Sequence, residues 1–93
     1  MLVVAAEVSL RLYSARTLKD KRQTVKPLLT RLPQRFPVAV AEVDHLDDPR
    51  SAVLGLACVG NSRVHLEEVL QRAVGFVAAN VDGEIYDVQI ETR

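Results

Sequence analysis

The order in which two hydrophobic periodicities follow one another constrains the fold of this chain most strongly. Apolar and polar residues alternate from Val4 to Leu12, which indicates a strand with one buried face. Residues 36–43 and 84–91 are expected to form strands as well. Residues 51–59, SAVLGLACV, are apolar on both faces, as expected of a strand in the middle of a sheet. The sequence therefore predicts four strands.

Two segments between these strands show helical periodicity and capping signals. Thr17 is followed by Asp20 three residues later, which is a variant of the capping box, and apolar residues then fall on one face of a helix. Ser62 is placed to cap a second helix, and Asn80 is expected to end it. Pro27 lies inside the first helix, where it lacks an N–H group and is expected to kink the helix.

The predicted order is βαββαβ. This order favours an α+β domain with the ferredoxin-like fold, in which a four-stranded antiparallel sheet carries both helices on one face. The first and third strands are expected in the middle of the sheet. Residues 1–93 are expected to form a single domain, since the chain is short and shows no linker. Aromatic residues make up only 4% of the chain, so we expect an aliphatic core.

The chain has no net charge, but its charges are unevenly distributed. Residues 1–35 hold eight Lys and Arg against two acids, a net charge of +6, and residues 36–93 hold four against ten, a net charge of −6. Such a split suggests a polyanion site on the basic half. The alternative is that the two halves attract each other within one fold.

Much of the positive charge lies in one short stretch, ARTLKDKRQTVK, which spans residues 15–26. Lys19, Arg22 and Lys26 share one flank of the first helix, beside its apolar face. Arg16 precedes the helix on the same side. These four residues form a basic strip, which we regard as a candidate nucleic-acid-binding surface.

Lys21 falls within the apolar arc of the same helix, unlike the other cations. A lysine in this position is expected to extend past the edge of the sheet to solvent, or to meet an acid. Glu42 is the candidate acid. The alternative is that Lys21 is a cation held at an anion site, and on that interpretation it joins the basic strip as a fifth nucleic-acid-binding residue.

Four segments resemble the YlxP-like family, a bacterial family of unknown function: ARTLKDKR, RFPVAVAEVDH, the AVLGLA strand and NSRVHLEEVLQRA. The resemblance covers almost the whole chain and implies the ferredoxin-like fold. Genes of this family often lie beside those for an initiation factor and a ribosome-binding factor, so the resemblance implies a link to ribosomes or RNA. The chain departs from the family pattern at Pro49, where relatives usually carry tryptophan, and at Pro27.

No residue pattern in the chain is typical of a catalytic site. A polar turn contains four metal-capable side chains, Asp44, His45, Asp47 and Asp48. Their spacing does not match an EF-hand, so we expect a solvated loop and no metal. Cys58 lies in an apolar run and is expected in the core. No glycine-rich phosphate loop is present, and we expect neither a cofactor nor enzymatic activity.

The strands offer no aromatic platform on which bases could stack. The positions expected to face away from the helices are Val3, Ala5, Glu7, Val53, Gly55, Ala57, Val59 and Ile85. RNA, and ribosomal RNA in particular, is therefore expected to bind the basic strip through its phosphates.

Two other hypotheses remain open at this point. The apolar stripe on the sheet suggests an alternative, an oligomeric structural or regulatory domain without nucleic acid, in which a second copy covers the stripe or pairs with an edge strand. The third hypothesis is an enzyme acting on a small anion, which would require a cleft joining Lys21 to the His45 turn.

The single cysteine and the lack of a signal peptide or apolar span predict a cytoplasmic protein without a membrane partner.

Overall fold

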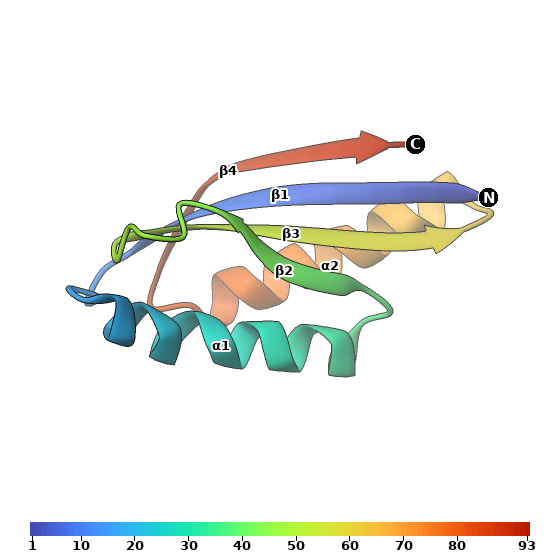
Figure 1. Cartoon of the computed structure of the whole chain (residues 1–93). Helices are drawn as coiled ribbons and strands as arrows, with labels where there is room; N and C mark the ends of the chain where they lie inside the picture. Colours follow the sequence, from blue (N-terminus) through green and yellow to red (C-terminus); the bar gives the residue numbers. More distant parts are fainter.

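Strands and helices follow one another in the order predicted from the sequence. The computed structural model describes all of residues 1–93 (Figure 1). Its elements are β1 (Leu2–Leu12), α1 (Leu18–Arg35), β2 (Ala39–Asp44), β3 (Ser51–Gly60), α2 (Arg63–Asn80) and β4 (Gly83–Thr92). The strands pair antiparallel in the order β2-β3-β1-β4, so the first and third strands are central as predicted. The chain has the ferredoxin-like α+β fold.

Both helices pack on the same face of the sheet, and the core lies between the two layers (Figure 1). The core is aliphatic, as predicted, with Val8, Leu10 and Leu54 fully buried. Cys58 is also buried there, and its burial raises the pKa of the thiol. Neither helix is long and apolar enough to cross a membrane.

The predicted helix caps are present. Thr17 Oγ1 accepts a hydrogen bond from the backbone N–H of Asp20 at 3.1 Å, and the Asp20 carboxylate accepts the N–H of Thr17 in return. Ser62 Oγ accepts the N–H of His65 at 3.3 Å. Helix α1 continues through Pro27 to Arg35 as one element, and it shows no sharp bend where a kink was expected (Figure 1). Pro27 is exposed, and water can therefore solvate the carbonyl group that its missing N–H leaves free.

Two sequence-based placements were wrong. The second strand begins at Ala39 instead of residue 36, because Phe36 caps α1 and its carbonyl accepts the N–H of Val38. Ile85 does not face away from the helices. A bulge in the pairing of β1 with β4 sets Ile85 opposite Leu10, and Ile85 packs against the core.

Candidate anion-binding surface

Lys21 is buried and anchors the turn between β2 and β3. Its side chain is only 3% exposed, and Nζ lies 2.6 Å from Glu42 Oε2. The same ammonium donates to the backbone carbonyls of His45 at 2.6 Å and Asp48 at 2.9 Å, with that of Leu46 at 3.5 Å. The predicted pairing with Glu42 is confirmed, and the predicted route to solvent is wrong.

The ammonium group of Lys21 is enclosed by groups of the protein itself. Two backbone carbonyls accept hydrogen bonds from Nζ within 2.9 Å, and the Glu42 carboxylate beside it balances the positive charge. The contact with Glu42 is an ion pair and not an aligned hydrogen bond, since Oε2 accepts no hydrogen bond of good geometry. The structure therefore separates Lys21 from the basic strip. Its role is to hold the turn against α1.

Three of the four metal-capable side chains of this turn make hydrogen bonds within the turn and its flanks. Asp44 Oδ1 accepts the N–H of His45, which has a positive φ of 57°. Asp48 Oδ1 accepts the N–H of Arg50 at 2.9 Å, and His45 Nδ1 lies 2.7 Å from Ser51 Oγ. The fourth, Asp47, is exposed. No three His, Cys, Asp or Glu side chains of the chain come together as a group able to hold a metal ion.

The basic strip is exposed along its whole length. Its members Arg16, Lys19, Arg22 and Lys26 are all solvent-exposed, and no carboxylate lies within 4.0 Å of their charged groups. The nearest acid in the sequence, Asp20, accepts the backbone N–H groups of Arg16 and Thr17. These hydrogen bonds lower the pKa of Asp20. The strip therefore does not pair with the acidic half of its own chain.

The structure extends the positive surface at both ends of the strip. Arg31 follows Lys26 on α1 by more than one helical turn. It lines the same shallow hollow as Lys19, Arg22 and Lys26. Arg50 lies at the other end, where it lines a cleft together with Arg16. Sequence reasoning missed Arg50, because only the folded turn brings it beside the start of α1.

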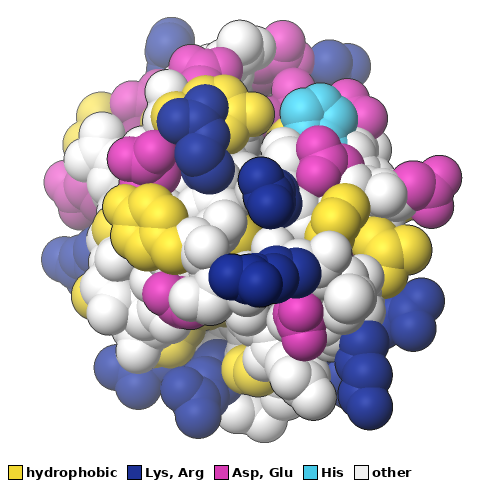
Figure 2. All heavy atoms as spheres, turned by 90° about the vertical axis from the view of Figure 1, so that its left-hand side faces the viewer, with side chains coloured by type: hydrophobic (Ala, Val, Ile, Leu, Met, Phe, Trp, Pro, Cys, Tyr) yellow, Lys and Arg dark blue, Asp and Glu magenta, His cyan; other side chains and the backbone are white.

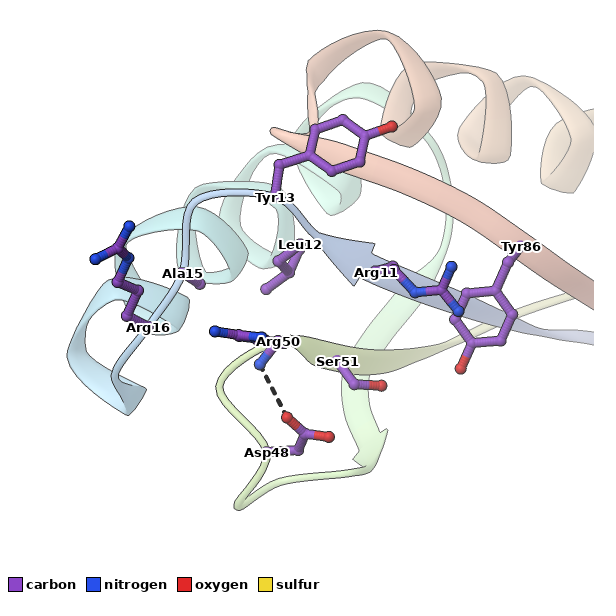
Figure 3. A pocket seen from close by; sticks show the side chains of 9 residues that line it. All are labelled: Arg11, Leu12, Tyr13, Ala15, Arg16, Asp48, Arg50, Ser51 and Tyr86. Atoms are coloured by element: carbon purple, nitrogen blue, oxygen red, sulfur yellow. Dashed lines mark hydrogen bonds between the residues drawn. The ribbon is translucent and has the colours of Figure 1, made fainter.

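This cleft lies at the end of the molecule where α1 begins (Figure 3). Viewed from that end, Lys and Arg side chains gather near the middle, with Asp and Glu side chains around them (Figure 2). The hydrogen bond from Leu12 N–H to Arg50 O, 2.8 Å long, ties the end of β1 to the turn. The cleft is lined by Asp48 and Arg50 of the turn and by Ser51 at the start of β3, but not by Lys21 or His45. The enzyme hypothesis requires a cleft that joins Lys21 to the His45 turn, and the cleft at this end of the molecule does not do so.

The open face of the sheet is different in character. It carries a shallow hollow lined by small residues, among them Ala5, Ala41 and Gly55. Val43 and Val59 are 48% and 63% exposed. On this face, the β4 residues that pair with β1 are polar or acidic: Asp87, Gln89 and Glu91. Such a face offers apolar contact area but repels phosphates.

Comparisons with known proteins agree with this fold and leave the function open. The family model described as "Protein of unknown function (DUF503)" matches residues 3–90. The uncharacterized protein YlxP of Bacillus subtilis (strain 168) is 38% identical over 72 residues, which cover 77% of this chain and 78% of YlxP. Among solved structures, the chain is similar to the de novo designed protein Ferredog-Diesel, with a TM-score of 0.52 and 9% sequence identity. The match covers 96% of this chain and 83% of the designed chain. At that identity the likeness concerns the fold alone.

Proposed function

The chain belongs to the DUF503 family, whose function is unknown, and we propose that it is a non-enzymatic protein that binds RNA, in particular ribosomal RNA, through the basic strip. One observation carries this proposal. Four exposed cations, one just before α1 and three along one of its flanks, have no carboxylate partner in the protein. Cations that stabilise nothing internally are free to neutralise the phosphates of a polyanion.

The geometry of the strip favours backbone contacts over base recognition. Lysine ammonium and arginine guanidinium groups on an exposed helix meet phosphate oxygens, which carry no sequence information. The open sheet face presents Glu7 and Glu91 where RNA-binding sheets present aromatic rings. RNA is therefore expected to approach the helix side, with little selection among sequences. On this proposal the protein acts in the cytoplasm, where ribosomes are found.

The salt dependence of RNA affinity tests the proposal. With about four phosphate contacts, the logarithm of the association constant should fall with the logarithm of salt concentration at a slope of about −3 to −4. Co-sedimentation with ribosomes should accordingly occur at low salt and disappear at high salt. Binding that is absent at low salt, or that does not respond to salt, would count against the proposal.

A second candidate function is favoured by the open sheet face. Val43, Val59 and the small residues between them form an apolar surface that a second copy of the chain could cover. On this account the protein is an oligomeric structural or regulatory domain. Light scattering at high micromolar concentration should then give the mass of a dimer or larger oligomer. The substitution Val59→Lys would shift the mass toward that of the monomer, and a monomeric wild type would exclude this candidate.

A further inference from the structure

The cleft beside the start of α1 combines unpaired cations with exposed aromatic rings. Its volume is about 650 Å³, which lies within the range of small-molecule sites. Arg11, Arg16 and Arg50 line it against one carboxylate, that of Asp48, so the lining carries three positive charges and one negative charge. The excess of positive charge favours an anionic ligand.

The three arginines are not equivalent. Arg11 is held within the protein, since its Nη1 lies 3.1 Å from Glu84 Oε1 and its guanidinium lies over the ring of Tyr86, 5.1 Å from the centroid. Arg16 and Arg50 have no ion-pair partner. Figure 3 shows these two arginines toward one end of the cleft and Arg11 with Tyr86 toward the other. Guanidinium groups suit phosphate, because their N–H groups match two phosphate oxygens at once.

The aromatic residues of the chain are divided between the interior and this cleft. Phe36 and Phe76 pack against each other edge to face, with centroids 6.0 Å apart. Both tyrosines of the chain line the cleft, and Tyr13 is 65% exposed. The backbone N–H of Tyr13 donates to Asp82 O at 3.1 Å, which fixes the position of the residue. An exposed ring on a fixed backbone can stack against a planar base.

We propose that this cleft binds the phosphate of a nucleotide, with Arg16 and Arg50 on the phosphate and Tyr13 against the base. The nucleotide is either a free mononucleotide or the phosphorylated 5′ end of an RNA strand. In the second form the inference rests on the proposed function, because the strand would continue from the cleft along the basic strip. Arg16 belongs to both surfaces and lies where they join.

Calorimetric titration with adenosine 5′-monophosphate, adenosine and inorganic phosphate tests the cleft directly. The monophosphate should bind saturably and shift the ring NMR signals of Tyr13. Adenosine should bind at least about tenfold more weakly, since the charge-assisted hydrogen bonds to phosphate are lost. Inorganic phosphate should also bind more weakly, because it lacks the base. Equal affinity for adenosine and its monophosphate, or no binding of either, would overturn the inference.

Three single variants locate the binding. Arg16→Gln and Arg50→Gln should each weaken monophosphate binding by at least about tenfold. Arg72→Gln is the matched control, since Arg72 is an exposed arginine on α2 without an ion-pair partner. The Arg72→Gln variant should bind the monophosphate as tightly as the wild type. The inference fails if neither cleft variant weakens binding, or if the control weakens it equally.

A pair of RNA oligonucleotides of one sequence, with a 5′-phosphate or a 5′-hydroxyl end, separates the two sources of the ligand. If the cleft takes the strand end, the 5′-phosphate should strengthen binding to the wild type, and Arg50→Gln should remove that advantage. Monophosphate binding without such an advantage would identify the free nucleotide as the ligand. Failure of both oligonucleotides to bind, with monophosphate binding intact, would refute the proposed function and leave the cleft supported. Binding of the oligonucleotides without binding of the monophosphate would refute the cleft alone and leave the proposed function supported.

Discussion

Helices α1 and α2 serve the same structural purpose with different charge. Each has 18 residues, a Ser or Thr N-cap and an aliphatic face buried on the same side of the sheet. Helix α1 carries six Lys and Arg and one Asp, a net charge of +5, whereas α2 carries two Arg and two Glu, a net charge of zero with neutral histidine. Since α2 packs without excess charge, packing on the sheet does not by itself require the excess charge of α1. On the proposed function, the excess serves a partner outside the protein.

The cations of α1 themselves divide into two groups. The Lys21 side chain is 3% exposed and holds the turn after β2 through Glu42 and two backbone carbonyls. Lys19 and Arg22, its neighbours in sequence, are exposed and unpaired. One helix thus contributes a structural cation on its buried side and unpaired cations on its exposed side, which bind RNA on the proposed function. Substitutions on the two sides should have opposite effects on stability and binding.

The largest effect on stability is expected from Lys21→Met. This change leaves Glu42 and the carbonyls of His45 and Asp48 without their cation, which should cost about 3–5 kcal/mol of unfolding free energy. Urea denaturation measures the change. Arg72→Met on α2 is the control and should change stability by less than about 0.5 kcal/mol, because the side chain is exposed.

The double variant Lys21→Met/Glu42→Met sharpens this prediction. It removes the unpaired carboxylate but leaves the carbonyls of the turn unsatisfied, so only part of the lost stability should return. If Lys21→Met alone were as stable as the wild type, the structural role given to this lysine would be wrong.

Removing either helix cap should cost less stability than Lys21→Met, and the two caps should differ in their cost. Thr17→Ala and Ser62→Ala each remove one capping hydrogen bond and should cost about 0.5–2 kcal/mol at neutral pH. Only α1 has an acidic partner in its cap, Asp20. Thr17→Ala keeps the backbone N–H that donates to Asp20, so α1 retains part of its cap and should lose less stability than α2. An equal or larger cost for Thr17→Ala would contradict this.

The cap of α1 should also depend on pH. Hydrogen bonds from Arg16 and Thr17 lower the pKa of Asp20 in the folded protein. The stability that Asp20 contributes is therefore present above its unfolded pKa of about 3.9 and is lost as the pH falls through the lower folded value. Thermal unfolding of the wild type and Asp20→Asn between neutral and acidic pH checks this. The two melting temperatures should converge in acid, and a constant difference would contradict the account.

The sequence alone predicted the fold well, because periodicity reports local structure directly. Alternation from Val4 to Leu12 and the capping box at Thr17 depend only on neighbouring residues, and both are confirmed. The bulge that turns Ile85 inward depends on the pairing of β1 with β4. Such a pairing irregularity leaves no signal in a single strand, so Ile85 was misplaced.

The candidate site was predicted only in part for the same reason. The helical wheel separated Lys21 from the basic strip, and Glu42, named as a candidate acid from its place late in the second strand, is the partner in the structure. The cleft could not be predicted, since Tyr13, Arg50 and Tyr86 come from three distant parts of the chain. Periodicity places residues on faces of their own element, but only tertiary structure brings the ends of different elements together.

The central claim, that the excess charge of α1 serves RNA and not the fold, is tested most directly by two variants of equal net charge. Lys19→Gln/Arg22→Gln/Lys26→Gln removes three charges from the basic strip. Gln71→Glu/Arg72→Gln/Ala78→Glu lowers the net charge by three at exposed positions of α2. RNA affinity is measured against salt for both, together with the melting temperature.

The strip variant should lose RNA binding at physiological salt, its log–log slope should shrink by about 2–3 units, and its melting temperature should stay near that of the wild type. The α2 variant should keep the wild-type slope. Equal loss of affinity in both variants would show that only net charge matters. A strip variant that melts much earlier yet binds RNA as before would contradict the claim, because the charge of α1 would then serve the fold.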